Sequence, residues 1–218
     1  MSVRRARRLP LEELRPYLLE VPAAAGAGPP AVLDGRAVFG NGHPVEVEVG
    51  FGKGLSLLTA AVANPDVNFV GVEVVRKYQL FTATRTAKRD LRNVRLACAD
   101  ARLFLRDCVG SASLRAVHVY FPDPWWKKRH HKRRVFTPEF AAQCERVLAP
   151  GGRLHLATDV EEYFGLMREA LAPLSGLRPL PGSGGPAGDQ DYRTNFERKA
   201  RERGGTVYRA VYGRLAST

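Results

Sequence analysis

Three acidic residues stand at the carboxyl ends of successive predicted strands and could together hold a nucleoside. Glu73 ends the second strand, Asp100 follows the third and Asp123 follows the fourth. Because the carboxyl ends of parallel strands meet at one edge of a sheet, these carboxylates are expected in one crevice. Glu73 is placed to accept from ribose hydroxyls and Asp100 from an adenine amino group. Solvated acids that cap loops would produce a similar pattern, but three strand ends in succession favour a ligand site.

A glycine-rich turn joins the first predicted strand to its helix. Gly50, Gly52 and Gly54 have the spacing G-x-G-x-G, which lets backbone amides approach a ligand. The dinucleotide fingerprint requires its third glycine one position later, where Leu55 stands. Glu48, just before the turn, would repel a pyrophosphate but suits an amino-acid ammonium. S-adenosylmethionine carries adenosine, a sulfonium and such an ammonium, and fits this turn better than the hydride-carrying dinucleotides do.

A strongly basic segment lies shortly after Asp123. Residues 125–134 read Trp-Trp-Lys-Lys-Arg-His-His-Lys-Arg-Arg, with six fixed positive charges and no acid. Basic side chains follow phosphates and aromatic rings stack on bases. Such a run could also be a solvated surface or a targeting signal, but its position beside the predicted crevice favours RNA binding.

The elements that must position these residues alternate between strand and helix. This alternation predicts a parallel sheet with helices on both of its faces. The expected strands are 45–49, 68–73, 94–99, 116–121, 153–158 and 206–212. The expected helices are 55–63, 76–91, 101–108, 138–148 (with Thr137 as N-cap) and 160–171.

The chain divides into an arm and one domain. Residues 1–40 are expected to form a basic N-terminal arm and linker, with a short helical pattern at 11–19. Residues 41–218 are expected to form a single domain that contains a flexible loop at about 175–190, where glycine and proline are frequent.

The composition indicates a folded protein with an anionic partner. Hydrophobic residues make up 44% of the chain, which argues against disorder, and the net charge of +12 favours nucleic acid. The longest apolar run, 55–63, is too short to cross a bilayer, and no apolar signal core follows the basic start, so a cytoplasmic protein without membrane contact is expected. The three cysteines are widely spaced and the histidines form no ligand pair, so neither a disulfide framework nor a metal site is expected.

Five motifs together resemble the bacterial tRNA (guanine-N7-)-methyltransferases. They span about residues 45–212, and the fourth-strand motif is the most specific of them. In order, they are Glu48-Val-Gly-Phe-Gly-Lys-Gly, Gly71-Val-Glu-Val, Phe121-Pro-Asp-Pro-Trp-Trp-Lys-Lys-Arg-His-His-Lys-Arg-Arg, Ala157-Thr-Asp and Thr194-Asn-Phe-Glu.

The resemblance implies a Rossmann-like class I methyltransferase fold, with a mostly parallel seven-stranded sheet and a C-terminal antiparallel strand. It also implies S-adenosyl-L-methionine as methyl donor and N7 of a guanine in the variable loop of tRNA, position 46, as acceptor. The product would be 7-methylguanosine.

Site residues follow from the same resemblance. Asp123 is the implied catalytic centre. The implied cofactor residues are Glu48, Gly50, Gly52, Gly54, Glu73, Asp100 and Asp123. The implied substrate and tRNA contacts are Lys127, Arg129, His130, His131, Lys132, Arg133, Arg134, Asp159, Thr194, Asn195, Phe196 and Glu197. Asn195 departs from the lysine more often expected there, which leaves its role open.

Three other functions are compatible with the residues alone. These are an RNA methyltransferase acting on another base atom or on ribosomal RNA, a basic Rossmann-like binding module, and a nucleotide-dependent oxidoreductase. A monomer and a homodimer are both compatible with this sequence.

Overall fold

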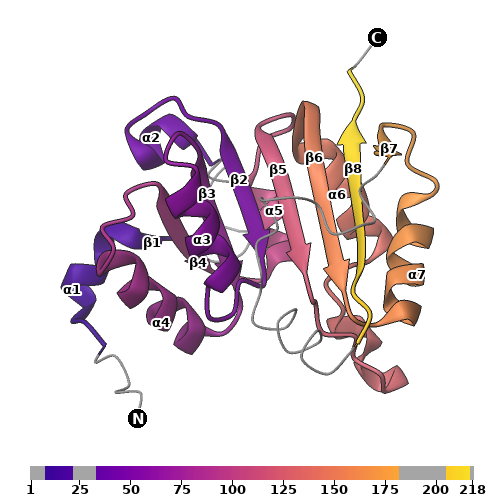
Figure 1. The fold of residues 1–218 in the computed structure, drawn as a ribbon, viewed down its shortest axis with the longest axis horizontal. Helices are drawn as coiled ribbons and strands as arrows, with labels where there is room; N and C mark the ends of the chain where they lie inside the picture. The colour runs from indigo at the N-terminus through magenta and orange to yellow at the C-terminus, as the bar shows by residue number, and fades with distance from the viewer. Residues whose placement is uncertain (1–7, 22–32, 182–204, 217–218) are drawn as a thin grey trace.

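The computed structural model describes residues 8–21, 33–181 and 205–216 and contains one mixed sheet (Figure 1). Across these residues the sheet has eight strands in the order β1-β4-β3-β2-β5-β6-β8-β7. The neighbouring strands from β1 to β6 run parallel, whereas β8 runs antiparallel to both β6 and β7. The strands are β1 (Leu18–Leu19), β2 (Val45–Val49), β3 (Asn68–Glu73), β4 (Val94–Cys98), β5 (Leu114–Tyr120), β6 (Leu148–Thr158), β7 (Leu177–Pro179) and β8 (Tyr208–Arg214).

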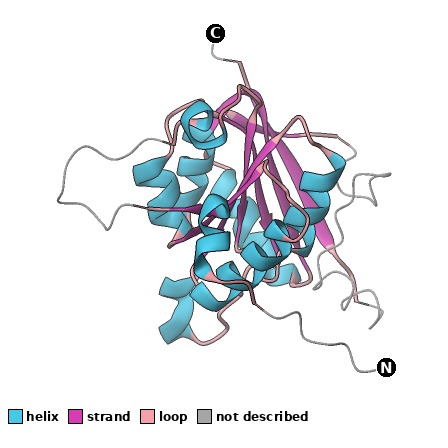
Figure 2. Cartoon of the chain, turned by 90° about the vertical axis from the view of Figure 1, so that its left-hand side faces the viewer, coloured by secondary structure: helices cyan, strands magenta, loops and turns pink. Residues whose placement is uncertain are grey.

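Helices cover both faces of this sheet, as the alternation of elements predicted (Figure 2). In Figure 1, α3 and α4 lie in front of the sheet and α5 and α6 lie behind it. The helices are α1 (Leu11–Leu14), α2 (Gly35–Phe39), α3 (Leu55–Ala63), α4 (Arg76–Ala87), α5 (Ala101–Cys108), α6 (Pro138–Val147) and α7 (Glu161–Leu171). The described residues also contain two 3₁₀ helices, η1 (Arg15–Tyr17) and η2 (Lys128–Arg133).

Two hydrophobic cores lie on opposite faces because strand side chains alternate in direction. One core packs Phe104, Phe140 and Met167 of α5, α6 and α7 against Val47 and Val117. The other core packs α3 and α4 against the opposite face of β3 and β4, where Phe69 and Leu96 project. Packing on both faces of the sheet therefore fixes the positions of the strand ends.

Part of the predicted N-terminal arm packs against this body. Leu14 is completely buried, Tyr17 is buried, and β1 pairs with β4 at the edge of the sheet. The hydroxyl of Tyr17 also donates to Asp90 at 3.0 Å. The eight strands of the described residues are one more than the resemblance implies, and β1 and β7 are the two that lie outside the six ranges expected from the sequence. The proposed division of the chain at residue 40 stays a prediction.

Some element boundaries differ from the expected ones for local reasons. Helix α4 ends at Ala87 instead of 91 because the chain turns at Asp90, whose φ is +49°. The short helix α2 was not predicted, since five residues carry too little periodicity. Its N-terminus is capped by Asp34, which accepts from the amides of Arg36 and Ala37.

The flexible loop predicted at about 175–190 is only partly described. Its first part contains β7, which pairs with β8 through Leu177 and Arg214, so this part was wrongly predicted as a loop. Backbone pairing at the sheet edge orders these residues, which the composition could not indicate. Residues 182–190 lie outside the described part of the chain.

Candidate functional site

The carboxyl ends of the parallel strands bring the predicted acids to one edge of the sheet. Glu73 pairs in register with Cys98, and the amide of Ala99 donates to the carbonyl of Glu73 at 3.2 Å. Asp100 therefore follows the strand next to that of Glu73. The strand that leads to Asp123 ends at the same edge, because β5 is parallel to β2. The predicted convergence of strand ends is confirmed at the level of sheet topology.

The glycine turn between β2 and α3 needs glycine for two different reasons. Gly50, Gly52 and Gly54 have φ values of +70°, +52° and +68°, which L side chains rarely adopt. At Gly54 an added Cβ would also collide with the side chain of Thr82. At Gly50 and Gly52 an added Cβ would meet no atom of the described residues within 4 Å, so a ligand can approach the backbone there.

Glu73 holds the glycine turn in place. One carboxylate oxygen accepts from the amide of Gly52 at 3.0 Å, and the other accepts from the amide of Val75 at 2.9 Å. Each oxygen keeps a lone pair for a further donor. The side chain is buried, so its position is set before any ligand arrives.

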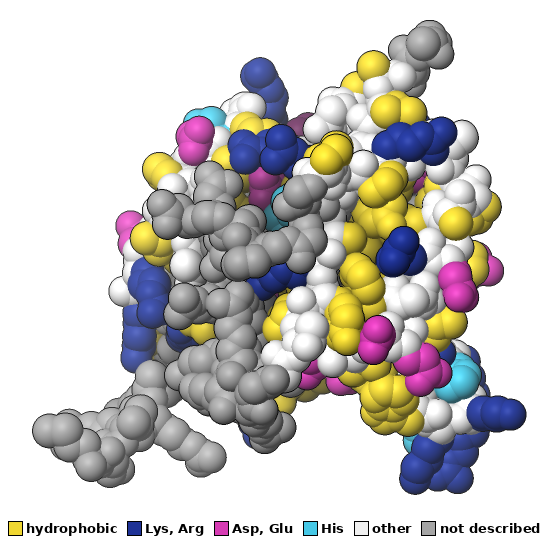
Figure 3. Space-filling view, turned by 45° about the vertical axis from the view of Figure 1, so that its right-hand side comes forward, with side chains coloured by type: hydrophobic (Ala, Val, Ile, Leu, Met, Phe, Trp, Pro, Cys, Tyr) yellow, Lys and Arg dark blue, Asp and Glu magenta, His cyan; other side chains and the backbone are white. Residues whose placement is uncertain are grey.

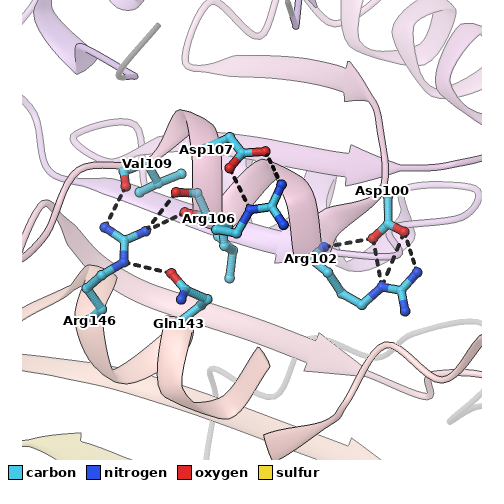
Figure 4. Close-up of polar contacts among 8 residues, drawn as sticks. Asp100, Arg102, Arg106, Asp107, Val109, Gln143 and Arg146 are labelled. Carbon is cyan, nitrogen blue, oxygen red and sulfur yellow. Dashed lines mark hydrogen bonds and ion pairs between the residues drawn. The ribbon is translucent and has the colours of Figure 1, made fainter. Parts of the chain in front are cut away.

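Asp100 caps helix α5 and forms an ion pair with an arginine in the first turn of the same helix. Its Oδ1 atom accepts from the amide of Arg102 at 2.9 Å, and its Oδ2 atom accepts from Nη2 of Arg102 at 2.6 Å (Figure 4). The hydrogen bond from the Arg102 side chain is the main cause that holds the pKa of Asp100 below its usual range. Asp100 is therefore ionised at neutral pH and can accept from a ligand's amino group.

Glu48 differs from Asp100 in that its carboxyl is buried within the protein. Burial raises the pKa of Glu48 to about 8, although the neighbouring Ser56 hydroxyl lowers it in part. At pH 7 the carboxyl is thus mostly protonated and neutral. The predicted pairing of Glu48 with an ammonium group stays a prediction, and it would require the carboxyl to lose its proton.

Replacing Glu48 by glutamine is expected to stabilise the protein at alkaline pH. The folded-state pKa lies above the unfolded one, so folding takes up a proton and wild-type stability falls as the pH rises from about 4.5 to about 8. The decrease is at most about 1.4 kcal/mol per pH unit. Glutamine has no such titration, so the stability difference between Glu48→Gln and wild type should widen from pH 5 to pH 8.

Urea unfolding at several pH values measures this difference. Glu46→Gln is a useful comparison, because the pKa of Glu46 is lowered and not raised. Burial is the largest single influence on this pKa and by itself would raise it. The hydrogen bond and charge of His118 and the charge of Arg115 outweigh that burial. A gap between wild type and Glu48→Gln that stays constant over this pH range would contradict a buried, neutral Glu48.

Glu73, Asp100 and the glycine turn suit the nucleoside part of S-adenosylmethionine. The open side of the turn at Gly50 and Gly52 admits a ligand to the backbone, and Glu73 offers carboxylate acceptors suited to vicinal hydroxyls. Asp100 offers an ionised acceptor one strand further along. The set therefore provides acceptors for a nucleoside, whereas a pyrophosphate would favour an arginine or lysine clamp over these acids.

The loop after β5 has an unusual backbone on both sides of Asp123. Phe121 has a φ of +49° and Trp125 a φ of +46°, although neither is glycine. The amide of Phe121 donates to the carbonyl of Ala157 at 2.7 Å, which ties the loop to β6. Strained backbone of this kind gathers at functional sites, and Asp123 is exposed at the centre of it.

Arg134 binds the backbone of the loop immediately after Asp123. Its Nε atom donates to the carbonyl of Pro124 at 2.6 Å, and its guanidinium lies over the ring of Tyr163, 5.5 Å from the centroid. The hydroxyl of Tyr163 in turn accepts from the amide of Phe136 at 3.4 Å. Arg134 therefore has a structural role here besides its predicted contact with tRNA.

The remaining basic residues form a projecting surface around η2. Lys127, Lys128, Arg129, His131, Lys132 and Arg133 are exposed, and His130 is half-buried. Figure 3 shows dark blue Lys and Arg side chains with histidine gathered at its lower right corner. We call residues 127–134 the basic segment.

The two tryptophans that precede the basic segment differ in their surroundings. Trp125 packs against the segment itself, with the Arg133 guanidinium 4.9 Å above its ring and the His130 ring edge-on at 5.6 Å. Trp126 has 61% of its surface exposed. Of the two rings, Trp126 is the one available to stack on a base.

The other predicted substrate residues are only partly described. Asp159 is exposed directly after β6, at the same sheet edge as Asp123. The predicted contacts Thr194, Asn195, Phe196 and Glu197 lie outside the described residues.

Two residues of the site were not anticipated from the sequence. Arg102 contacts both Asp100 and the basic segment, where its Nη1 atom donates to the carbonyl of Lys132 at 3.0 Å. Tyr163 supports Arg134 from α7. The spacing of Asp100 and Arg102 at a helix start could have suggested their pairing, but the contacts across the fold have no local signal.

Among residues 8–21, 33–181 and 205–216, no group of three or more histidine, cysteine, aspartate or glutamate side chains could hold a metal ion. No helix in these same ranges is long and apolar enough to span a membrane.

Solved structures with the same fold include other methyltransferases. The 16S rRNA methyltransferase KamB aligns with a TM-score of 0.58 at 16% identity, over 79% of this chain and 88% of that one. The aminoglycoside resistance methyltransferase NpmB1 aligns with a TM-score of 0.55 at 18% identity, over 79% of this chain and 87% of that one. At these identities the likeness concerns the fold alone, and it confirms the predicted class I methyltransferase fold.

Sequence comparison gives a closer relationship. A family model described as "Putative methyltransferase" matches residues 42–210. The tRNA (guanine-N(7)-)-methyltransferase of Rhodopirellula baltica is 44% identical over 84% of this chain and 70% of its own length. The enzyme of the same name from Pseudomonas aeruginosa is 40% identical over 84% of this chain and 76% of its own length. With this extent of similarity, and with the strand-end acids and basic segment in place, the chain belongs to the bacterial tRNA (guanine-N7-)-methyltransferase family.

Proposed function

We propose that this protein transfers a methyl group from S-adenosyl-L-methionine to N7 of a guanine in tRNA, giving 7-methylguanosine. The target we propose is the guanine at position 46 in the variable loop. The observation that carries the proposal is the meeting of a glycine turn, two strand-end acids and a basic segment at one edge of the sheet. The names of the relatives support the choice of tRNA and of N7.

The proposed cofactor supplies an electrophilic methyl group on a sulfonium. Glu73 would accept from the ribose hydroxyls and Asp100 from the adenine amino group, with the amides of the glycine turn nearby. Because Glu73 already holds Gly52, the turn is arranged before the ligand binds. This arrangement limits the entropy that binding must overcome.

Methylation at guanine N7 requires no general base, because N7 carries a lone pair and no proton. The residues of the chain would therefore act by position and charge. In favourable cases, alignment of two reacting groups contributes about 7–11 kcal/mol to the lowering of a barrier. The guanine becomes cationic as the methyl group arrives, so a nearby carboxylate stabilises the developing charge.

Asp123 is the carboxylate that we assign to this role. It is exposed at the sheet edge, between two strained residues of the loop that leads to the basic segment. A carboxylate also accepts from guanine N1–H and the exocyclic amine, which adenine does not offer in the same pattern. Asp159, after the next strand, and Glu197 are proposed to share the recognition of guanine.

The basic segment is proposed to hold the tRNA phosphates, with the exposed ring of Trp126 stacking on a base. Exposed cations next to an exposed aromatic ring are suited to single-stranded or looped RNA. Because the substrate is tRNA, we place the protein in the cytoplasm.

Incubation with labelled S-adenosylmethionine and unmodified bulk tRNA, followed by nucleoside mapping, tests the proposed function. We expect label in 7-methylguanosine at position 46, and none in ribosomal RNA that is incubated in parallel. Label in another nucleoside would identify a different RNA methyltransferase. Binding of tRNA without any transfer of label would favour a binding module, and binding of NAD in a parallel titration would favour an oxidoreductase.

A further inference from the structure

Arg102 connects the two halves of the proposed site. Its Nη2 atom donates to Oδ2 of Asp100 at 2.6 Å, and its Nε atom lies 3.1 Å and 3.2 Å from the two carboxylate oxygens. Its remaining terminal nitrogen, Nη1, donates to the carbonyl of Lys132 at 3.0 Å. One guanidinium therefore contacts both an acid assigned to the cofactor and the backbone of the basic segment.

The chemistry of arginine suits this double contact. A guanidinium is planar and presents its donors in a fixed fork, so one edge can bind a carboxylate while another donor points elsewhere. Asp100 also caps the helix on which Arg102 stands, which fixes the relative position of the two residues. Moving the carboxylate would consequently move the donor that holds Lys132.

Helix α5 gives this contact a firm base. Arg146 of α6 binds the other end of α5, donating to the carbonyls of Leu105 at 2.6 Å and Val109 at 2.9 Å (Figure 4). Arg146 therefore fixes the C-terminal end of α5. The N-terminal end, which carries Asp100 and Arg102, is the end at which a bound ligand would act.

A second arginine on α5 offers a natural comparison. Arg106 forms a similar fork-like pair with Asp107, at 2.6 Å and 2.7 Å. Figure 4 shows the two pairs on the same helix. Both Arg106 and Asp107 belong to α5 itself, so this pair does not join separate parts of the site.

We propose that Arg102 is a positioning residue that couples cofactor binding at Asp100 to tRNA binding at the basic segment. This inference rests on the proposed function, since it takes Asp100 as a cofactor contact and the basic segment as an RNA contact. The coupling is positive: each ligand strengthens the binding of the other.

The sign follows from the order that each ligand imposes. A ligand amino group bound to Asp100 restricts the carboxylate, and through it the Arg102 side chain and the carbonyl of Lys132. The basic segment then loses less conformational freedom when RNA binds, which strengthens the second binding event. Thermodynamic reciprocity requires tRNA to strengthen cofactor binding by the same factor.

The test compares the affinity for unmodified tRNA with and without saturating S-adenosylhomocysteine, which permits no methyl transfer. Fluorescence anisotropy gives both dissociation constants, and their ratio is the coupling factor. For wild type we expect a factor of about 5 or more. For Arg102→Lys and Arg102→Ala we expect a factor within about twofold of 1, since neither side chain can hold both partners as a fork does.

Arg106→Ala is the matched control and should keep the wild-type coupling factor. A wild-type factor near 1, or an unchanged factor in both Arg102 variants, would overturn the proposal. Parallel weakening of both ligands with the ratio preserved would likewise overturn it, because that result indicates a structural role only. Nucleoside mapping tests the proposed function separately, so production of 7-methylguanosine without coupling would reject this inference alone.

Discussion

Replacing Asp123 by asparagine or alanine is expected to lower kcat about 100- to 1,000-fold while leaving the affinity for tRNA within about twofold of wild type. In the proposed mechanism the carboxylate stabilises positive charge that develops on guanine only during methyl transfer, so its removal should affect the transition state more than the bound substrate. Asp123 is exposed, and its loop is held by Phe121 and Arg134 instead, so folding should be unaffected. Single-turnover methylation with saturating tRNA and cofactor measures the effect.

Comparing Asp123→Asn with Asp123→Ala separates the effect of losing the negative charge from the effect of shortening the side chain. Asparagine keeps the shape of the side chain and one carbonyl acceptor but removes the charge, so a large decrease in Asp123→Asn assigns the effect to charge. Asp159→Asn, at the neighbouring strand end, serves as the matched carboxylate control and should reduce kcat less. Turnover near the wild-type rate in Asp123→Ala would remove Asp123 from the reaction.

Replacing Lys128 and Lys132 together by glutamine is expected to weaken tRNA binding on the order of tenfold at moderate salt. Both side chains are exposed on η2, and the structural contact of Lys132 with Arg102 is made by its backbone carbonyl, which the substitution keeps. For each RNA phosphate that is no longer neutralised, the slope of log affinity against log salt should fall in magnitude by about 0.7–0.9. Binding titrations over a series of salt concentrations give both quantities.

Lys128→Arg with Lys132→Arg is the matched control, because it keeps both charges and should keep the salt slope. Arg134 is less suitable for this experiment, since its guanidinium also supports Pro124 and Tyr163. An unchanged salt slope in the glutamine variant would exclude these two lysines from the RNA surface.

Most of the longer strands and helices could be predicted from the sequence, because the residue preferences that mark them are local. The alternating run at 45–49, the Asn64-Pro65 stop and the Thr137-Pro138 start each mark an element by short-range preferences. The helix beginning at Pro138 and the strand ending at Glu73 occur where these preferences place them. The two-residue strand β1 and the five-residue helix α2, which is little more than one helical turn, have too few positions for a periodic signal and were missed.

The ionisation of the acids could not be predicted, because it depends on surroundings that the chain creates only by folding. Glu48 and Asp100 are both strand-end carboxyls in sequence. Burial keeps Glu48 largely protonated at neutral pH, whereas the hydrogen bond from the Arg102 side chain keeps Asp100 ionised. Two carboxyl groups of one site thus differ in charge at neutral pH, one neutral and one negative.

Motifs and short-range periodicity were sufficient to predict the family, the chain order of the longer strands and helices, and the residue types at the strand ends. Which groups meet depends on long-range packing: Glu73 binds the glycine turn, Arg102 reaches the basic segment, and Trp125 is packed while Trp126 is exposed. The first two contacts join residues that are 21 and 30 positions apart, and side-chain direction and burial at such separations are set by the packing of the whole sheet.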